Sequence, residues 1–562
     1  MNLNRIKISL LLSVCLLMAS CGFLDKDLDD TVTDEQILRD PTLMGGLLIN
    51  TYNYIPRNDN SFNCIDGAML DCATDDGIDS SPSSDIHNMN NGAWGPSKVI
   101  DDQWGRLYYG VRACALFFSY IDRSNVPDTE VLDNDGMPSE DSNLKSRYKA
   151  EAKVLRALIY SELIKRFGDV PLVVDLLDPN AEELNLPRTP YAEIVDSIVK
   201  WCDEAIPYLP LKYSDSTQGR VTKGVALMVK SRTLLYAASK LNNPENNKDK
   251  WKKAADAAKE VIDLSEQNGN LYVLNKDFSA PFSKPFDPEI IFPCKYYQRN
   301  DIELNNTPNG YDRGGGRTNP TQSLVDAYEI KINGTYVSYD PQNAEHLNKR
   351  YSADRDPRLA KTVLYNGAVF KQRPVETFVG GRDGLNLRQG FTRTGYYLRK
   401  FLSEDIDLNA DNSTLPRAWI FFRYAEALLN YAEAQNEYLD TPDQSVYSRL
   451  NQVRKRSMGD AGVISAGTLD KDEMRKRIRN ERRVELAFEE HRFFDIRRWD
   501  EGINYFNKPV YGMKVTKIGN SSYSYEQFKV EERIFDPKMN MFPLSQSAVL
   551  KAPLTGQTKG WN

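Results

Sequence analysis

The stretch MRKRIRNERRVELAFEEHRFFDIRRW, from Met474 to Trp499, is the most distinctive run in the chain. At about 100° per residue, its acidic side chains fall along one stripe of a helix, with arginines beside them. The stripe consists of Glu481, Glu485, Glu489 and Arg492, and the neighbouring arginines are Arg475, Arg479, Arg482 and Arg483. The spacing predicts a charged helix over residues 474–499.

The paired carboxylates of this segment allow two interpretations. Two carboxylates one turn apart could serve as a general acid and base, or as a glycosidase pair. A general acid needs a raised pKa, however, whereas adjacent guanidinium groups hold carboxylates ionised. Side chains at i and i+4 also point the same way, so they do not flank a bond from opposite sides. A salt-bridged structural helix is therefore favoured over a catalytic one.

Helical patterns recur through much of the chain. Residues 104–122 and 147–167 carry apolar side chains at helical spacing, and Gly168 supplies a stop after the second segment. Alanines at packing positions let neighbouring helices approach closely. This predicts a mostly α fold of tetratricopeptide-like helical hairpins, with a generic helical bundle as the alternative because the repeat consensus does not appear cleanly. Further helices are predicted at residues 191–208, 223–240, 251–264, 423–436 and 445–455.

Long polar and aromatic segments separate these helices, at residues 54–98, 280–318 and 365–414. Loops beyond about 15 residues in compact domains are usually functional or disordered, and the aromatic content here favours an ordered surface. Residues 510–562 have few helix signals and many Tyr, Phe, Pro and Gly residues. We expect strands and loops there, wrapped on the helices.

The N-terminus has the three-part layout of a secretory signal peptide. Its apolar run, Ile8 to Ser20, is shorter than the roughly 20 residues that span a bilayer. Met18-Ala19-Ser20-Cys21 resembles a bacterial lipobox, which predicts that residues 1–20 are removed and that Cys21 is acylated; an ordinary signal peptide with an incidental cysteine is the alternative. Two or more acyl chains anchor a protein stably, so the mature chain is expected to be anchored, with residues 21–32 as an acidic tether.

Composition excludes several classes of function. Lys+Arg 72 against Asp+Glu 79 gives a formal net charge of −7, which lacks the positive field that nucleic acids require. With 3 His and 7 Cys, and with no zinc, Walker or serine-hydrolase motif, the sequence points to no cofactor and no metal. Cys64 and Cys72 could form a disulfide, but free buried thiols are favoured.

The segment RNERRVELAFEEHRFFDIRRW resembles the hallmark of the SusD/RagB family of outer-membrane nutrient-binding lipoproteins. Glu490 stands where the family pattern has Gly, and Ile496 stands where it has Leu. The similarity runs from the tether to the C-terminus. Other family-like motifs occur in the expected order: NPTQSLVDAYE (Asn319 to Glu329), RDPRL (Arg355 to Leu359), TGYYLRKF (Thr394 to Phe401), FRYAEALLNYAEA (Phe422 to Ala434) and MFPLSQ (Met541 to Gln546).

This resemblance implies both an architecture and a role. The architecture is a SusD-like superhelix of four tetratricopeptide-like hairpins with an irregular, loop-rich and short-strand ligand-binding portion, divided into an N-terminal helical region at 33–240 and a C-terminal region at 241–562. The role is non-catalytic: a surface-exposed lipoprotein of the outer membrane captures oligosaccharides and passes them to a SusC-like TonB-dependent transporter. A peptide-binding member of the family is the alternative, followed by a glycoside hydrolase or an assembly scaffold.

Sugars present apolar C–H faces and polar rims, so their sites need exposed aromatic side chains with planar polar partners. The Gly-rich turn at 314–316 would let the backbone approach a ligand. A packing role is the alternative for Trp94 and for the tyrosines, and Trp104 is expected in the core. The candidate ligand-binding residues are Asp75, Asp76 and Trp94 in the first long segment, where family members often place ligand contacts, and Tyr296, Tyr297, Arg313 and Arg317 in the second.

Overall fold

The structure, a computed structural model, describes residues 32–56, 65–131, 142–178, 185–214, 217–294, 297–388 and 390–561. The expected signal peptide, Cys21, nearly all of the tether, Cys64 and Tyr296 lie outside these residues. Among the described residues, none of the helices combines the length and the hydropathy that a bilayer crossing requires.

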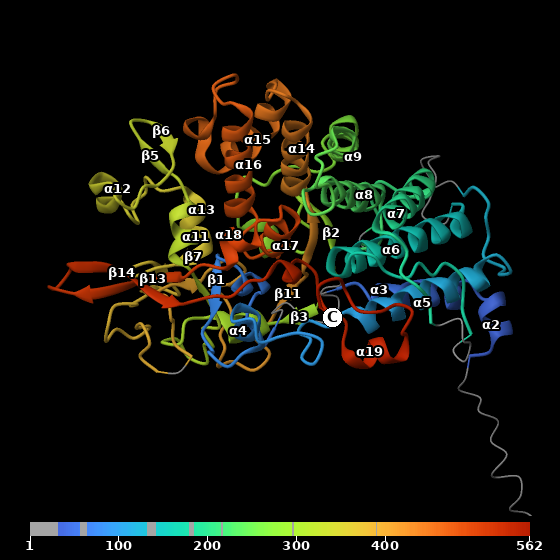
Figure 1. The fold of residues 1–562 in the computed structure, drawn as a ribbon, viewed down its shortest axis with the longest axis horizontal. Coiled ribbons are helices and arrows are strands. Elements are labelled where there is room, and N and C mark those ends of the chain that lie inside the picture. Colours follow the sequence, from blue (N-terminus) through green and yellow to red (C-terminus); the bar gives the residue numbers. More distant parts are fainter. Residues whose placement is uncertain are drawn as a thin grey trace, which may run out of the picture.

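Helices packed in chain order form a curved array (Figure 1). From α5 to α9 each helix packs against the next, and α9 then packs against α14, which contacts both α15 and α16. The prediction of a mostly α fold is confirmed. The array consists of α2 (Asp34–Arg39), α3 (Pro41–Tyr52), α5 (Trp104–Ile121), α6 (Leu144–Phe167), α7 (Tyr191–Ala205), α8 (Lys223–Ala238), α9 (Lys248–Gln267), α14 (Tyr424–Tyr438), α15 (Gln444–Met458) and α16 (Lys471–Glu485).

Small side chains explain the close contact between α9 and α14. Ala254 and Ala255 of α9 and Ala434 of α14 belong to one buried cluster, together with Leu235 and Trp251. An alanine occupies little space beyond the backbone, so two helices that meet through alanines can approach closely. The array therefore continues across the long insertion, residues 268–423, that separates these helices in the sequence.

The first long segment (residues 54–98), the insertion and the residues after α16 carry short helices and strands, and the strands form two-stranded antiparallel pairs (Figure 1). The hairpin of β13 and β14 confirms the strands expected in the C-terminal segment. The strand pairs are β1 (Gly77–Asp79) with β4 (Thr318–Pro320), β2 (Ile290–Pro293) with β12 (Ile420–Arg423), β3 (Tyr297–Arg299) with β11 (Leu415–Arg417), β5 (Ile330–Ile332) with β6 (Thr335–Val337), β7 (Val363–Leu364) with β10 (Tyr397–Leu398), β8 (Val369–Phe370) with β9 (Arg373–Pro374), and β13 (Val510–Lys517) with β14 (Tyr523–Glu531). The short helices are α4 (Asp85–Asn90), α10 (Asp301–Asn306), α11 (Gln322–Ala327), α12 (Ala344–Asn348), α13 (Pro357–Thr362), α17 (His491–Arg498), α18 (Gly502–Phe506) and α19 (Gln546–Lys551).

The charged segment is not one helix, which corrects the prediction for residues 474–499. Helix α16 ends at Glu485, and α17 begins at His491. Between them Phe488 and Glu490 adopt φ of +62° and +68°, a left-handed conformation that ends a right-handed helix. Glu490 replaces the Gly of the family pattern, and glycine is the residue that adopts this conformation without strain. Glu489 therefore lies in the turn rather than on the stripe of α16.

Candidate functional site

The acidic side chains of the hallmark segment lie in a buried ion network. Glu485 is fully buried and accepts hydrogen bonds from Arg358 Nη1 at 2.8 Å, Arg423 Nη1 at 2.8 Å and Arg456 Nη2 at 2.5 Å. Glu489, from the following turn, accepts from Arg423 Nε at 2.7 Å. The network thus joins α16 to α13, to the end of β12 and to α15.

These contacts set the ionisation of Glu485. Burial alone would raise its pKa, but the guanidinium groups of Arg456, Arg423 and Arg358 outweigh burial and hold the pKa of Glu485 well below its usual value. A carboxylate that is ionised and surrounded by guanidinium donors is a poor general acid. The geometry supports the structural interpretation of this segment.

Asp75 and Asp76, two of the candidate ligand contacts, are engaged in ion pairs with the same segment. Asp75 accepts from Arg492 Nε at 2.9 Å and Nη2 at 2.8 Å, and Arg483 Nε donates to Asp76 Oδ1 at 2.6 Å. Asp76 is completely buried. These pairs hold the first long segment against α16 and α17. They engage both oxygens of Asp75 and Oδ1 of Asp76, whereas Asp76 Oδ2 is buried and has no hydrogen-bond partner among the described residues.

Trp94 lies in the core rather than on an exposed platform. Its side chain is 6% exposed, and its ring lies 5.0 Å from that of Trp561 and 5.5 Å from that of Phe542, measured between centroids. This placement agrees with the alternative interpretation of Trp94, in which its ring packs in the core instead of binding a ligand. A ligand-binding role for Trp94 stays a prediction, and the buried ring does not favour it.

The candidates in the second long segment are dispersed. Arg317 donates to Asp79 from Nε at 2.9 Å and from Nη2 at 2.8 Å, which links the residue before β4 to the last residue of β1. Arg313 is exposed, has φ of +55°, and donates from Nη1 to the Leu408 carbonyl at 2.7 Å. Tyr297 is half-buried in β3. The structure does not gather the described candidates around one cavity.

The Gly-rich turn has a packing explanation. A Cβ placed on Gly315 would lie 2.7 Å from the carbonyl oxygens of Leu304 and Asn305, and one on Gly314 would collide with the carbonyls of Thr307 and Pro308. The glycines are needed because another part of the backbone approaches this closely.

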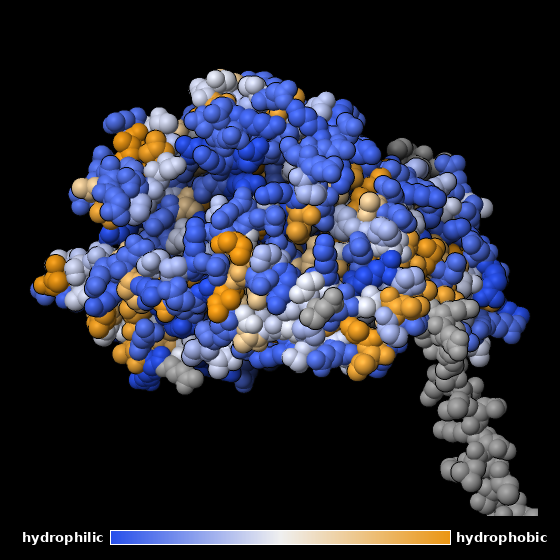
Figure 2. Space-filling model, viewed as in Figure 1, coloured by the Kyte–Doolittle hydropathy of each residue, from blue (hydrophilic) through white to orange (hydrophobic). Residues whose placement is uncertain are grey.

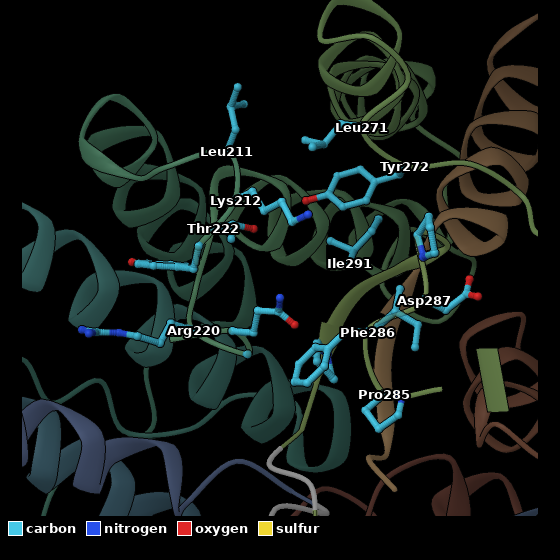
Figure 3. A pocket seen from close by; sticks show the side chains of 16 residues that line it. Leu211, Lys212, Arg220, Thr222, Leu271, Tyr272, Pro285, Phe286, Asp287 and Ile291 are labelled. Atoms are coloured by element: carbon cyan, nitrogen blue, oxygen red, sulfur yellow. The ribbon is translucent and has the colours of Figure 1, made fainter. Parts of the chain in front are cut away.

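A cavity of about 250 Å³ lies between the segment that precedes α8 and the segment that leads into β2 (Figure 3). Phe286, 40% exposed, lies on one side of it, and Leu211, Lys212 and Thr222 come from the other. Residues 211–222 do not form a long loop, so loop length in the sequence does not point to them. An aromatic side chain flanked by Pro285 and Pro288 is the one signal that points to this cavity.

A larger groove, of about 460 Å³, runs along α5. Trp104 and Tyr108 line it with their rings 4.7 Å apart, and Tyr109 is 66% exposed beside them. Trp104 is half-buried, so the expectation that it belongs to the core holds for only part of its surface. Close to this groove, apolar side chains gather over α19 (Figure 2), where Leu550 is 81% exposed.

Cys72, Cys114 and Cys202 are free thiols, and these three cysteines and Cys294 are all buried. Within the described ranges, no group of three or more His, Cys, Asp or Glu side chains is placed to hold a metal ion.

Two family models match this chain. The model described as "SusD family" matches residues 288–561, and the model described as "Starch-binding associating with outer membrane" matches residues 23–235. The chain belongs to the SusD/RagB family. The resemblance found in the sequence is thereby confirmed, and it extends over both halves of the chain.

SusD-like relatives and solved structures agree with this assignment. SusD-like protein P2 from Formosa agariphila is 26% identical over 395 residues, which cover 67% of this chain and 70% of that protein. A SusD-like protein from Bacteroides fragilis has a similar structure, with a TM-score of 0.75 and 25% identity over 95% of this chain and 99% of that chain. A SusD-like carbohydrate binding protein from the same organism has a TM-score of 0.71 and 24% identity, over 92% of this chain and 99% of that one.

In this SusD-family chain the hallmark motif holds α16 and α17 against α14. Arg498 of α17 donates to Glu433 of α14 through Nη1 at 2.6 Å and Nη2 at 2.7 Å. Arg482 of α16 donates from Nε to Asp495 of α17 at 2.9 Å. Ligand contacts in this SusD-family fold are therefore to be sought outside the motif.

Proposed function

We propose that this protein is a lipid-anchored binding protein of the outer membrane that captures oligosaccharides at the cell surface and passes them to a SusC-like TonB-dependent transporter. Family membership over both halves of the chain carries this proposal. The description of one matching model names starch binding and association with the outer membrane, and a protein of similar structure is described as carbohydrate binding.

The ion network supports capture without catalysis. Glu481 accepts from Arg358 Nη1 at 2.5 Å and from Arg454 Nη1 at 3.0 Å, and Glu485 and Glu489 are also held by guanidinium groups. A glycosidase needs one carboxylic acid that keeps its proton at working pH. Burial would raise the pKa of Glu485 and of Glu489, but the adjacent cationic groups outweigh burial and hold both pKa values below their usual range, so neither side chain meets that requirement.

The start of the helical body fits an anchor at Cys21. Helix α2 begins at Asp34 behind a capping box formed by Thr33 and Gln36. Thr33 lies twelve residue steps after Cys21, a distance that a chain can span over at most about 40 Å. Acylation of Cys21 would therefore keep the body close to the membrane that holds its transporter. We retain residues 33–240 and 241–562 as the two proposed regions of this body.

Exposed aromatic side chains beside cavities are the features that a sugar ring would use. Phe286 borders the cavity in front of β2, and Tyr109 borders the groove on α5. Each site is also lined by a polar side chain, Lys212 and Arg112 respectively. An apolar ring with a nearby polar group is the combination that a sugar needs, so we add both sites to the proposed ligand contacts.

Affinity electrophoresis of the mature protein in gels that contain neutral and acidic polysaccharides tests this function, with calorimetry on a peptide panel beside it. We expect retardation by at least one glycan and weaker retardation of the Phe286→Ala or Tyr109→Ala variant. Lys252→Gln, a change on the exposed side of α9, is the matched control. Binding to peptides alone would assign the protein to the peptide-binding members of the family, and binding to neither class would contradict the proposed function.

A further inference from the structure

A third cavity, of about 240 Å³, lies between the turn at residues 279–283 and the segment that follows β10. Four of its lining side chains are cationic and one is acidic, in a chain whose formal net charge is −7. Three serines add hydroxyl groups, one of which, that of Ser283, donates to the Ala280 carbonyl at 3.1 Å. The charged lining residues are Lys361, Arg399, Lys400, Arg417 and Glu404, and the serines are Ser279, Ser283 and Ser403.

Lys400 is a buried cation that lines this cavity. It is 2% exposed, and its Nζ donates to Glu489 Oε1 at 2.7 Å and to the Ala487 carbonyl at 2.8 Å. Burial lowers the pKa of Lys400 to about 8, although Glu489 opposes that shift. One carboxylate therefore offsets the cost of burying this ammonium group only in part.

Arg417 is the second buried cation. Its Nη1 donates to the Phe401 carbonyl at 2.7 Å and to the Phe282 carbonyl at 3.2 Å, and its Nη2 donates to Glu303. Among the described residues, its buried Nε has no hydrogen-bond partner, and neither has Oε2 of Glu303. Arg417 therefore holds the walls of the cavity together while its own hydrogen bonding is incomplete.

Two further cations, Lys361 and Arg399, have partly exposed side chains. The side chain of Lys361 is 52% exposed, and its nearest carboxylate, Asp277, is 4.0 Å away. Arg399 donates to Glu404 at 2.9 Å in a pair whose side chains are 26% and 42% exposed. A partly exposed ion pair contributes little to stability, so an incoming anion can take the place of Glu404 at little cost.

We propose that this cavity binds the acidic group of a charged sugar, a carboxylate or a sulfate ester, and that the captured oligosaccharides are acidic. This inference rests on the proposed function and specifies its ligand class. The guanidinium of Arg399 matches the planar edge of an oxyanion, and Lys361 adds a mobile point charge. A volume below the roughly 300–1,000 Å³ of complete ligand pockets fits one charged unit of a longer chain.

The cavity adjoins one of the candidate residues from the sequence. Arg417 of β11 pairs with Tyr297 of β3, Cα to Cα, in the antiparallel register. Side chains of directly opposed residues lie on the same face of a two-stranded sheet. A sugar chain whose acidic unit occupies the cavity can therefore extend towards Tyr297.

Calorimetry with three sets of galactose-based oligosaccharides of equal length tests the proposal: oligogalacturonates, sulfated galactan fragments and neutral galactan fragments. The double variant Lys361→Gln/Arg399→Gln changes exposed or half-exposed side chains, and Lys252→Gln/Lys259→Gln, which also removes two positive charges from exposed side chains, is the charge-matched control on α9. We expect acidic oligosaccharides to bind more tightly than neutral ones. We also expect the double variant to lose about tenfold in affinity for the acidic set, with melting temperature and neutral binding unchanged.

Each outcome decides a separate question. Binding of oligogalacturonates alone identifies a carboxylate, and binding of sulfated fragments alone identifies a sulfate ester. If acidic and neutral sets bind equally, or if the double variant binds the acidic set as tightly as the wild type, the cavity proposal is wrong while the proposed function stands. If none of the three sets binds and polysaccharide gels show no retardation either, both proposals fail.

Discussion

Neutralising Glu485 tests whether the hallmark motif holds the fold together. In the Glu485→Gln variant the three guanidinium groups of Arg358, Arg423 and Arg456 remain buried while their shared carboxylate is lost. Removing one partner of a buried ion pair costs about 3–5 kcal/mol. With an unfolding entropy of about 2.1 cal/mol/K per residue, a body of about 500 residues changes its melting temperature by about 1 °C for each kcal/mol. The variant should therefore melt about 3–5 °C below the wild type.

Differential scanning calorimetry at pH 7 measures this shift, and Asp256→Asn provides the control. Asp256 pairs with Lys252 at 2.7 Å on the exposed side of α9, so its loss should change the melting temperature by less than about 1 °C. Because the pKa of Glu485 is lower in the folded state than its ordinary value, ionised Glu485 stabilises the fold. This stabilisation is complete above the ordinary pKa and is lost as the pH falls through the folded-state pKa. The difference in melting temperature between Glu485→Gln and the wild type should therefore become smaller in acid. A variant that melts with the wild type at pH 7 would refute the structural role of the motif.

Three further predictions concern single positions. Burial raises the pKa of Asp326 to about 6 from 3.8, so ionisation of this carboxyl in the folded state lowers the stability of the protein as the pH rises through this range. In urea unfolding, Asp326→Asn should be more stable than wild type by on the order of 1 kcal/mol at pH 8 and as stable as wild type at pH 4. A difference in stability that does not change with pH would contradict this prediction. Trp94→Ala should lose about 3–5 kcal/mol of stability because the ring is buried, whereas weaker glycan binding with unchanged melting would restore its role as a ligand contact. Cys21→Ala should move the protein from the membrane fraction to the soluble fraction and abolish palmitate labelling, and retention in the membrane would argue against the lipid anchor.

Helical periodicity is a local property, and for that reason the sequence predicts the helical array well. The segment predicted at 223–240 corresponds to α8, Lys223–Ala238, and the segment predicted at 191–208 corresponds to α7 followed by one turn of 3-10 helix. The sequence does not predict that the helix ends after Glu485, because the positive φ angles of Phe488 and Glu490 do not alter the spacing of hydrophobic residues. A glycine in the family pattern at position 490 is the one signal of this turn.

The candidate site was harder to predict because its contacts join distant parts of the chain. Asp75 looks like a loop carboxylate in the sequence, but its partner Arg492 lies more than four hundred positions away. Trp94 packs against Trp561, which comes from the C-terminal end. The cationic cavity likewise combines residues from the turn at 279–283, from α13 and from the segment after β10. Composition supplies the residue types for a sugar site, whereas the pairing of segments decides which of them stay exposed.

The most direct test of non-catalytic capture measures binding and product release in the same sample. The mature protein is titrated with an oligosaccharide that retards it in affinity gels, and the recovered ligand is then analysed for new reducing ends and for chain length. We predict saturable binding and full recovery of the intact oligosaccharide after prolonged incubation. Shortened chains that accumulate with time, and that Glu481→Gln or Glu485→Gln abolishes without loss of folding, would contradict the account.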